Sequence, residues 1–173
     1  MCGIVGFIGC KPAAPLLLEG LAKLEYRGYD SAGIALVSEA GIEIHKAKGR
    51  LSVLSAQIDE GQNMTETAGI GHTRWATHGK PSDENSHPHR SASGKFAVVH
   101  NGIIENYAVI KKQLQDEGVE FLSETDTEVV AQLLDKYYTG DFFAAVRSAV
   151  AQLEGSYALG ILCAGYPEEL VAV

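Results

Sequence analysis

The second residue of the chain is a small one, Cys2, and Gly3 follows it. Aminopeptidases remove an initiator methionine when the next residue is small, so Cys2 can become the first residue of the mature protein. Its free α-amine has a reference pKa of about 8, and it could take the thiol proton directly or through one water. Cys2 would then be an N-terminal nucleophile. The alternative is an ordinary cysteine at an ordinary terminus, and the rest of the chain has to decide.

A second group of chemically useful side chains lies at residues 72–79 (HTRWATHG), where an apolar segment gives way to a polar loop. Arg74 offers a planar fork of donors that suits a carboxylate, and Thr77 adds a hydroxyl donor. Trp75 is the only tryptophan and stands among polar residues, which favours a lid or gate. The structural alternatives are a salt-bridged surface arginine and a tryptophan that anchors the core. The residues alone leave both open.

An asparagine–glycine pair follows the apolar run at 96–100. The Asn101 side-chain amide and the Gly102 backbone N–H could both point at one oxygen, as an oxyanion hole requires. Glycine would let the backbone approach closely. The same pair is typical of a type I′ turn, and taken alone it favours the turn.

Residues 123–128 (SETDTE) combine a helix start with a spare carboxylate. Thr125 and Glu128 have the spacing of a capping box, which predicts a helix that continues to residue 138. Asp126 would lie in its first turn, where an acid stabilises the helix dipole. The functional alternative is a carboxylate that pairs with a substrate ammonium group.

Five histidines, at positions 72, 78, 87, 89 and 100, suggest a metal site. Their spacing matches neither a helical HExxH pair nor a Cys/His ribbon, so we expect histidines that form loop hydrogen bonds instead of a zinc site. The glycines form no phosphate-binding motif either.

The composition of the chain argues against several classes of protein, namely membrane-spanning, nucleic-acid-binding and secreted ones. With 173 residues the chain fits one domain, and it has no run of ~18 apolar residues that could span a membrane. A net charge of −8 argues against non-specific nucleic-acid binding. The three cysteines are sparse and form no CxxC pair, which favours reduced thiols in the cytoplasm. The N-terminus lacks the features of a secretory signal.

The elements that must position these residues alternate between strands and helices. Short apolar runs predict strands over 3–8, 33–37, 42–47, 68–73, 96–100, 157–164 and 170–173. Helical periodicity predicts helices over 13–24, 51–58, 107–117, 125–138 and 141–153, with Asn106 and Asp141 as N-caps. Neighbouring strands should form antiparallel sheets with helices on their outer faces, an α+β fold. Residues 75–94 form a long loop of the kind that is usually functional.

Five blocks of sequence, taken together, resemble a known family. They are MCGIVG at 1–6, LEYRGYDSAG at 24–33, HTRWATHG at 72–79, HNGIIEN at 100–106 and SETDTE at 123–128. In this order they resemble the N-terminal glutaminase domain of the glutamine–fructose-6-phosphate aminotransferases, which are class II, N-terminal-nucleophile amidotransferases. The resemblance spans essentially the whole chain. It implies a four-layer αββα sandwich of two antiparallel sheets.

The resemblance also implies a role for each candidate residue. Cys2 would be the nucleophile with its own amine as the base, and Asn101 and Gly102 would form the oxyanion hole. Arg74 would bind the α-carboxylate of L-glutamine, and Asp126 would bind its α-ammonium group. Trp75, Thr77 and His78 would belong to a loop that closes over the amino acid, and Arg27 and Gly28 would lie beside the N-terminus. Glutamine would be hydrolysed to glutamate and ammonia without a metal or an organic cofactor.

The family continues into sugar-phosphate isomerase domains, which residues 1–173 lack. We therefore expect an incomplete glutaminase domain, a view that the apolar ending at 170–173 supports. In the longer relatives the ammonia would pass to fructose 6-phosphate. Two alternatives stay open: a glutaminase domain that serves another acceptor, such as a phosphoribosyl compound, and a non-catalytic glutamine-binding fragment. No nucleic-acid or membrane partner is expected, and a homodimer is left open.

Overall fold

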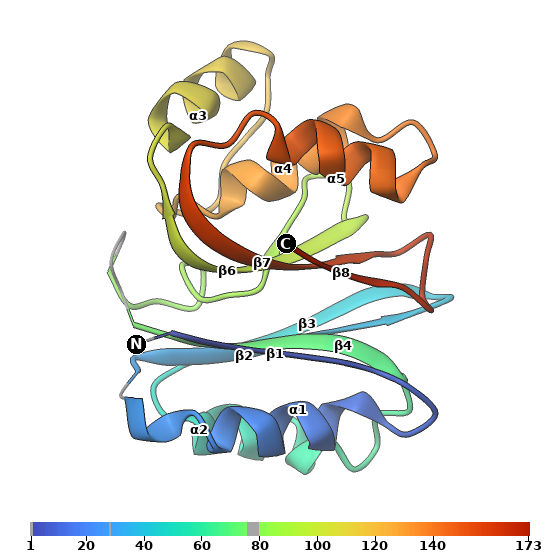
Figure 1. Ribbon diagram of the computed structural model, residues 1–173. Helices are drawn as coiled ribbons and strands as arrows, with labels where there is room; N and C mark the ends of the chain where they lie inside the picture. Colours follow the sequence, from blue (N-terminus) through green and yellow to red (C-terminus); the bar gives the residue numbers. More distant parts are fainter. Residues whose placement is uncertain (1, 28, 76–79) are drawn as a thin grey trace.

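The computed structural model describes residues 2–27, 29–75 and 80–173, without the side chain of Arg27. Within these ranges, two four-stranded antiparallel sheets lie face to face, with helices on the outer faces (Figure 1). The predicted α+β class and the four-layer αββα sandwich are confirmed.

The first sheet contains the N-terminal strands in the order β1-β4-β2-β3. Their bounds are β1 (Gly3–Ile8), β4 (Ala68–Arg74), β2 (Ser31–Ser38) and β3 (Gly41–Lys48). Helices α1 (Ala13–Ala22) and α2 (Leu51–Gln57) cover its outer face, and the short 3-10 turns η1 (Glu25–Arg27) and η2 (Asp59–Gly61) follow them. The side chains of α1 and α2 that face the sheet form an apolar layer with it, which includes Leu17, Leu21 and Ile34.

The second sheet has the order β5-β6-β7-β8. Its strands are β5 (His89–Arg90), β6 (Phe96–Ile104), β7 (Gly155–Cys163) and β8 (Leu170–Ala172). Helices α3 (Tyr107–Asp116), α4 (Glu128–Tyr137) and α5 (Phe142–Val150) cover its outer face. A larger apolar cluster, with Phe96 and Phe142 among its members, fills the space beneath these helices.

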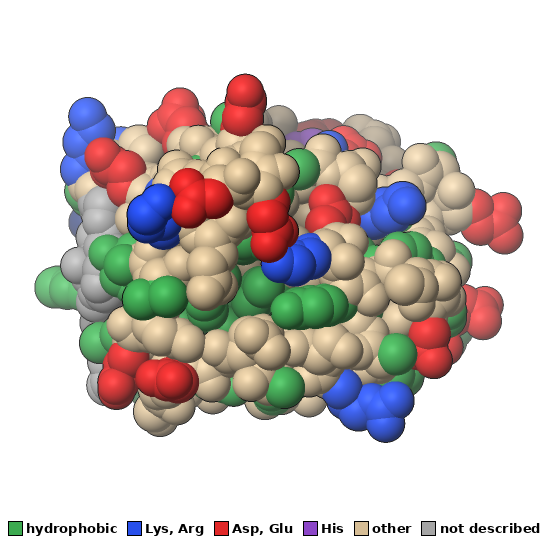
Figure 2. All heavy atoms as spheres, turned by 90° about the horizontal axis from the view of Figure 1, so that it is seen from above, with side chains coloured by type: hydrophobic (Ala, Val, Ile, Leu, Met, Phe, Trp, Pro, Cys, Tyr) green, Lys and Arg blue, Asp and Glu red, His purple; other side chains and the backbone are tan. Residues whose placement is uncertain are grey.

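A third apolar cluster joins the two sheets and includes Ile70, Val99 and Leu162. Because strands β2 and β4 have neighbours on both faces, their residues are buried almost without interruption instead of alternating. The outer face over α3–α5 mixes hydrophobic side chains with acidic and basic ones (Figure 2). Two of its lysines form ion pairs, Lys112 with Asp116 and Lys136 with Glu117.

The structure corrects several sequence predictions. Residues 75–94 are not all loop, because the two-residue strand β5 pairs with β6. The strand predicted to end at residue 100 continues to Ile104, so the Asn101–Gly102 pair lies inside a strand and not in a type I′ turn. Asn106 precedes α3 but makes no side-chain cap, since it bonds to Gln152 and Glu154 instead. The cap at Asp141 is confirmed, with a bond from Ala144 N at 2.9 Å.

The capping-box prediction for Thr125 and Glu128 is also wrong. Helix α4 begins at Glu128, and its N-cap position is Thr127 without a side-chain cap. The Glu128 carboxylate instead accepts hydrogen bonds from Leu122 N at 2.9 Å and Ser123 N at 2.6 Å, on the segment that precedes the helix. Among the described helices, none is long and apolar enough to cross a membrane.

Candidate active site

Cys2 lies directly before β1, at the end of the first sheet. Gly3, the first residue of β1, pairs with Thr73 near the end of β4, which brings the residues after β4 beside the cysteine. The backbone N–H of Trp75 donates to Cys2 Sγ at 3.1 Å, and Sγ lies 3.6 Å from Trp75 O. The thiol is partly exposed. The thiol is therefore held in place by a backbone contact and partly accessible to solvent.

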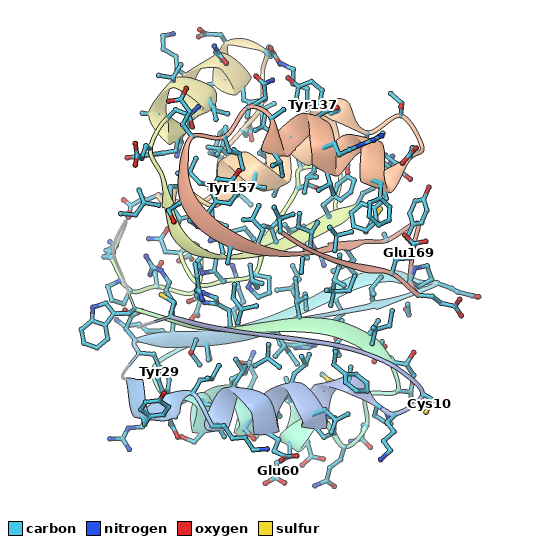
Figure 3. The ribbon with its side chains drawn as sticks, viewed as in Figure 1. Cys10, Tyr29, Glu60, Tyr137, Tyr157 and Glu169 are labelled. Atoms are coloured by element: carbon cyan, nitrogen blue, oxygen red, sulfur yellow. The ribbon has the colours of Figure 1, made fainter. Side chains whose placement is uncertain are left out.

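The other two cysteines lie elsewhere. Figure 3 places Cys10 beyond the far end of β1, at the opposite side of the molecule from the N-terminus marked in Figure 1. Cys163 is fully buried in β7. All three are free thiols. Cys10, which is exposed, provides a matched control for the reactivity of Cys2.

Asn101 and Gly102 reach the cysteine from the second sheet. Asn101 Nδ2 lies 3.5 Å from Cys2 O, so the two motifs meet although they are 99 residues apart in sequence. Gly102 has a φ of +119°, and a Cβ atom there would lie 2.2 Å from Ser156 O on the paired strand β7. Only glycine fits this backbone position.

Asp126 is attached to the same part of β6. Its Oδ2 accepts a hydrogen bond from Ile104 N at 3.0 Å and lies 3.9 Å from His100 Nδ1. The side chain is nearly buried, with 4% of the residue exposed. The hydrogen bonds that the Glu128 carboxylate accepts from Leu122 N and Ser123 N help to fix the loop that carries Asp126.

Arg74 ends β4 and is 3% exposed, so the alternative of a surface arginine is excluded. Its Nη1 lies 3.8 Å from Asp30 Oδ1, and its carbonyl accepts from Asp30 N at 2.8 Å. Trp75 is 54% exposed, which excludes the alternative of a core anchor. Arg74 thus ends the strand that pairs with β1, and Trp75 directly follows it.

The remaining candidates cannot be placed in the site. Gly28, Thr77 and His78 lie outside the described residues. Arg27 ends η1, and its side chain also lies outside the description. Their predicted roles stay predictions.

Sequence reasoning missed a cluster of buried histidines behind Asn101. His72 Nε2 lies 3.0 Å from His100 O and 2.9 Å from Asn101 Oδ1. His87 Nδ1 lies 3.1 Å from His72 Nδ1, while His87 Nε2 and His100 Nδ1 lie 2.7 and 2.9 Å from the Thr127 hydroxyl. These histidines bond to one another and to a threonine, with two of them on strands, so the prediction of loop hydrogen-bonders was only partly right. The sequence offered one indication of this cluster, because His72 and His100 are polar residues inside the apolar runs at 68–73 and 96–100.

Burial governs the charge of this cluster. Loss of hydration lowers the pKa of His72 to about 4, although hydrogen bonds from its ring to Asn101 and His100 act in the opposite direction. The pKa values of His87 and His89 are lowered well below their ordinary value, again mainly by burial. These three rings are therefore neutral at pH 7. Within the described parts of the chain, no three His, Cys, Asp or Glu side chains group as ligands for a metal ion.

The loop that carries His87 is held between the sheets by contacts with β2 and β3. A Cβ atom on Gly33 would lie 2.1 Å from His87 O, so glycine at this point of β2 makes room for the loop. Lys46 Nζ donates to Ser86 O at 3.0 Å, and Lys48 N donates to Asp83 Oδ1 at 2.7 Å. The histidine therefore enters the interior on a segment with several anchors.

Comparison with known proteins agrees with this geometry. Residues 72–172, more than half of the chain, match a family model described as a glutamine amidotransferase domain. The chain is 63% identical over 172 residues to the glutamine–fructose-6-phosphate aminotransferase (isomerizing) of Caldanaerobacter subterraneus subsp. tengcongensis, covering 99% of this chain and 28% of that protein. It is 57% identical over 173 residues to the same enzyme of Clostridium tetani, covering 100% of this chain and 28% of the relative. The chain thus spans little more than a quarter of the length of these relatives.

A solved structure is also similar. The glutamine phosphoribosylpyrophosphate amidotransferase of B. subtilis superposes with a TM-score of 0.81 at 28% identity, covering 95% of this chain and 35% of that one. Sequence match, fold and the meeting of Cys2 with Asn101 lead to one conclusion: the chain belongs to the glutamine amidotransferase family.

Proposed function

We propose that the chain hydrolyses the side-chain amide of L-glutamine, with Cys2 as the nucleophile. Two contacts of Cys2 carry this proposal: its thiol accepts a hydrogen bond from the Trp75 backbone N–H, and the Asn101 amide of the other sheet lies 3.5 Å from its backbone carbonyl oxygen. The proposal requires removal of Met1, because an amine in a peptide bond cannot act as a base. Met1 lies outside the described residues.

The steps follow from the groups present. The α-amine of Cys2 takes the thiol proton, and the sulfur attacks the glutamine carbonyl carbon. Asn101 and Gly102 supply the donors for the oxyanion of the tetrahedral intermediate. The intermediate collapses as the ammonium group returns its proton to the leaving nitrogen, which departs as ammonia. Water then cleaves the γ-glutamyl thioester to give glutamate and the free thiol.

Two nearly buried charges suit the α-carbon end of glutamine. Arg74 donates only and matches the carboxylate, whereas Asp126 accepts only and matches the ammonium group. Trp75, Thr77 and His78 would cover the bound amino acid, with Arg27 and Gly28 beside the N-terminus. Because both charges are shielded from water, each pairing would be stronger than on a surface.

The acceptor of the ammonia is a separate part of the proposal. We propose that this chain corresponds to the glutaminase domain of a longer protein whose further domains would use fructose 6-phosphate, as the names of the relatives state. Identities of 57–63% to these relatives, against 28% to the phosphoribosylpyrophosphate enzyme, support the sugar acceptor over the phosphoribosyl one.

Glutamate release from L-glutamine tests the proposal directly. Wild type and Cys10→Ala should both be active, because Cys10 lies at the far end of β1, while Cys2→Ala should be inactive. Equal activity of Cys2→Ala and wild type would refute the assignment. A wild type that binds glutamine but never releases glutamate would favour the non-catalytic alternative.

A further inference from the structure

The hydrogen bonds of His72 settle which way the Asn101 amide points. His72 Nε2 lies 3.0 Å from His100 O, a carbonyl that can only accept, so Nε2 carries a hydrogen. The Asn101 atom that faces this donor at 2.9 Å must then be its oxygen. The amide nitrogen Nδ2 is left to face Cys2, where it lies 3.5 Å from the cysteine carbonyl.

The other protons of the cluster follow in turn. His72 is neutral at pH 7, because burial lowers its pKa to about 4, so its Nδ1 accepts once Nε2 carries the hydrogen. The partner that donates to it is His87 Nδ1 at 3.1 Å. His87 is neutral for the same reason, and its Nε2 therefore accepts from the Thr127 hydroxyl at 2.7 Å.

The Thr127 hydroxyl links His87 to His100. Its single hydroxyl hydrogen goes to His87, so its oxygen accepts from His100 Nδ1 at 2.9 Å. The bonds thus run in one direction, from His100 through Thr127 and His87 to His72 and on to Asn101. The opposite direction would require both nitrogens of His72 to donate, which is a buried imidazolium that loss of hydration opposes.

We propose that this histidine chain (His100, Thr127, His87 and His72) is a positioning device that keeps the Asn101 amide aimed at the reacting carbonyl oxygen. The inference rests on the proposed glutaminase activity. All four members are at most 5% exposed, so water does not compete for their bonds. Thr127 would then influence turnover through three other side chains. Its loss would let the Asn101 amide rotate, which lowers kcat and leaves glutamine binding alone.

The direction of the histidine chain can be measured without activity. Nitrogen-15 NMR of the histidine rings at neutral pH reports which ring nitrogen carries the hydrogen in the wild-type protein. We expect the hydrogen on Nε2 of His72 and on Nδ1 of His87 and His100. A His87 ring protonated on Nε2 would overturn the inference, because His72 could not then be its acceptor.

Turnover tests the consequence for catalysis. Thr127→Val keeps the side-chain shape and removes the hydroxyl, whereas Thr127→Ser keeps the hydroxyl and serves as the matched control. We expect the valine variant to lose about tenfold or more in kcat, short of the 10²–10³-fold that follows loss of an oxyanion donor. Its KM should stay within about twofold of wild type, and the serine variant should retain most of the kcat.

The outcomes separate the two proposals. An active wild type whose Thr127→Val variant keeps its kcat, or an equal loss in the serine variant, would overturn the positioning role while the proposed function stands. A wild type that releases no glutamate would refute the proposed function itself, and the positioning role with it.

Discussion

Replacing His72 by glutamine should make the fold less sensitive to mild acid, even where it lowers stability at neutral pH. Burial holds the pKa of His72 at about 4 in the folded chain, against the ordinary histidine value of 6.5. Between these values the unfolded chain binds a proton at this residue and the folded chain does not. The contribution of neutral His72 to the free energy of unfolding is therefore fully present above pH 6.5, and it is lost as the pH drops toward 4.

The size of the effect follows from the shift. One pKa unit corresponds to about 1.4 kcal/mol, and integration from about pH 7.5 to about pH 5 gives a loss of about 2 kcal/mol from His72 alone. Carboxylates and the other histidines also titrate, but they are present in both proteins. The stability difference between wild type and His72→Gln should therefore be about 2 kcal/mol smaller at pH 5 than at pH 7.5.

Urea unfolding followed by circular dichroism at the two pH values measures this difference. Thr73→Val is the matched control, because Thr73 is the next residue of β4, is 1% exposed and does not titrate. The control should lose stability on acidification as much as wild type does. If His72→Gln and wild type lost stability in parallel, His72 would not be held neutral by burial, and the proton assignment of the histidine chain would lose its basis.

Three further predictions concern four positions of the candidate site. Asn101→Ala should lower kcat about 10²–10³-fold with little change in KM, and a mainly raised KM would show a binding role instead. Gly102→Ala should lower Tm, at a strain of roughly 1–3 kcal/mol or more, because its φ is +119° and the new Cβ would meet Ser156 O; an unchanged Tm would contradict this. Arg74→Lys and Asp126→Asn should each weaken glutamine binding by about 2–5 kcal/mol in calorimetric titrations. Unchanged affinity in both variants would show that neither charge binds the amino acid.

Sequence patterns predicted an element well where the residues that form the pattern also make the contacts that stabilise the element. The strand over 3–8 has the predicted bounds, and the Asp141 cap needs only Ala144 three residues away. The capping box at Thr125 failed because Glu128 bonds to Leu122 and Ser123, which a local rule does not weigh against its own pattern. Strand β5 was missed because two residues become a strand only when β6 lies beside them.

The residues of the candidate site also fall into two groups, those that the sequence could identify and those that it could not. The side chains with chemistry of their own, Cys2, Arg74 and Asn101, could be recognised by type and motif. Those that hold them in place could not, because His87 meets His72 and Thr127 at separations of 15 and 40 residues. Such contacts exist only once the two sheets have closed on each other. The turn predicted at Asn101 failed for the same reason, since its pairing with β7 is also distant in sequence.

Covalent labelling of the N-terminal cysteine tests the central claim most directly. The wild-type chain, incubated with the glutamine-like diazoketone 6-diazo-5-oxo-L-norleucine, should show by intact mass the loss of Met1 and the gain of one adduct. Peptide mapping should place that adduct on Cys2, and excess L-glutamine should prevent it. Labelling of Cys10, or a chain without Met1 that takes up no label, would contradict the account.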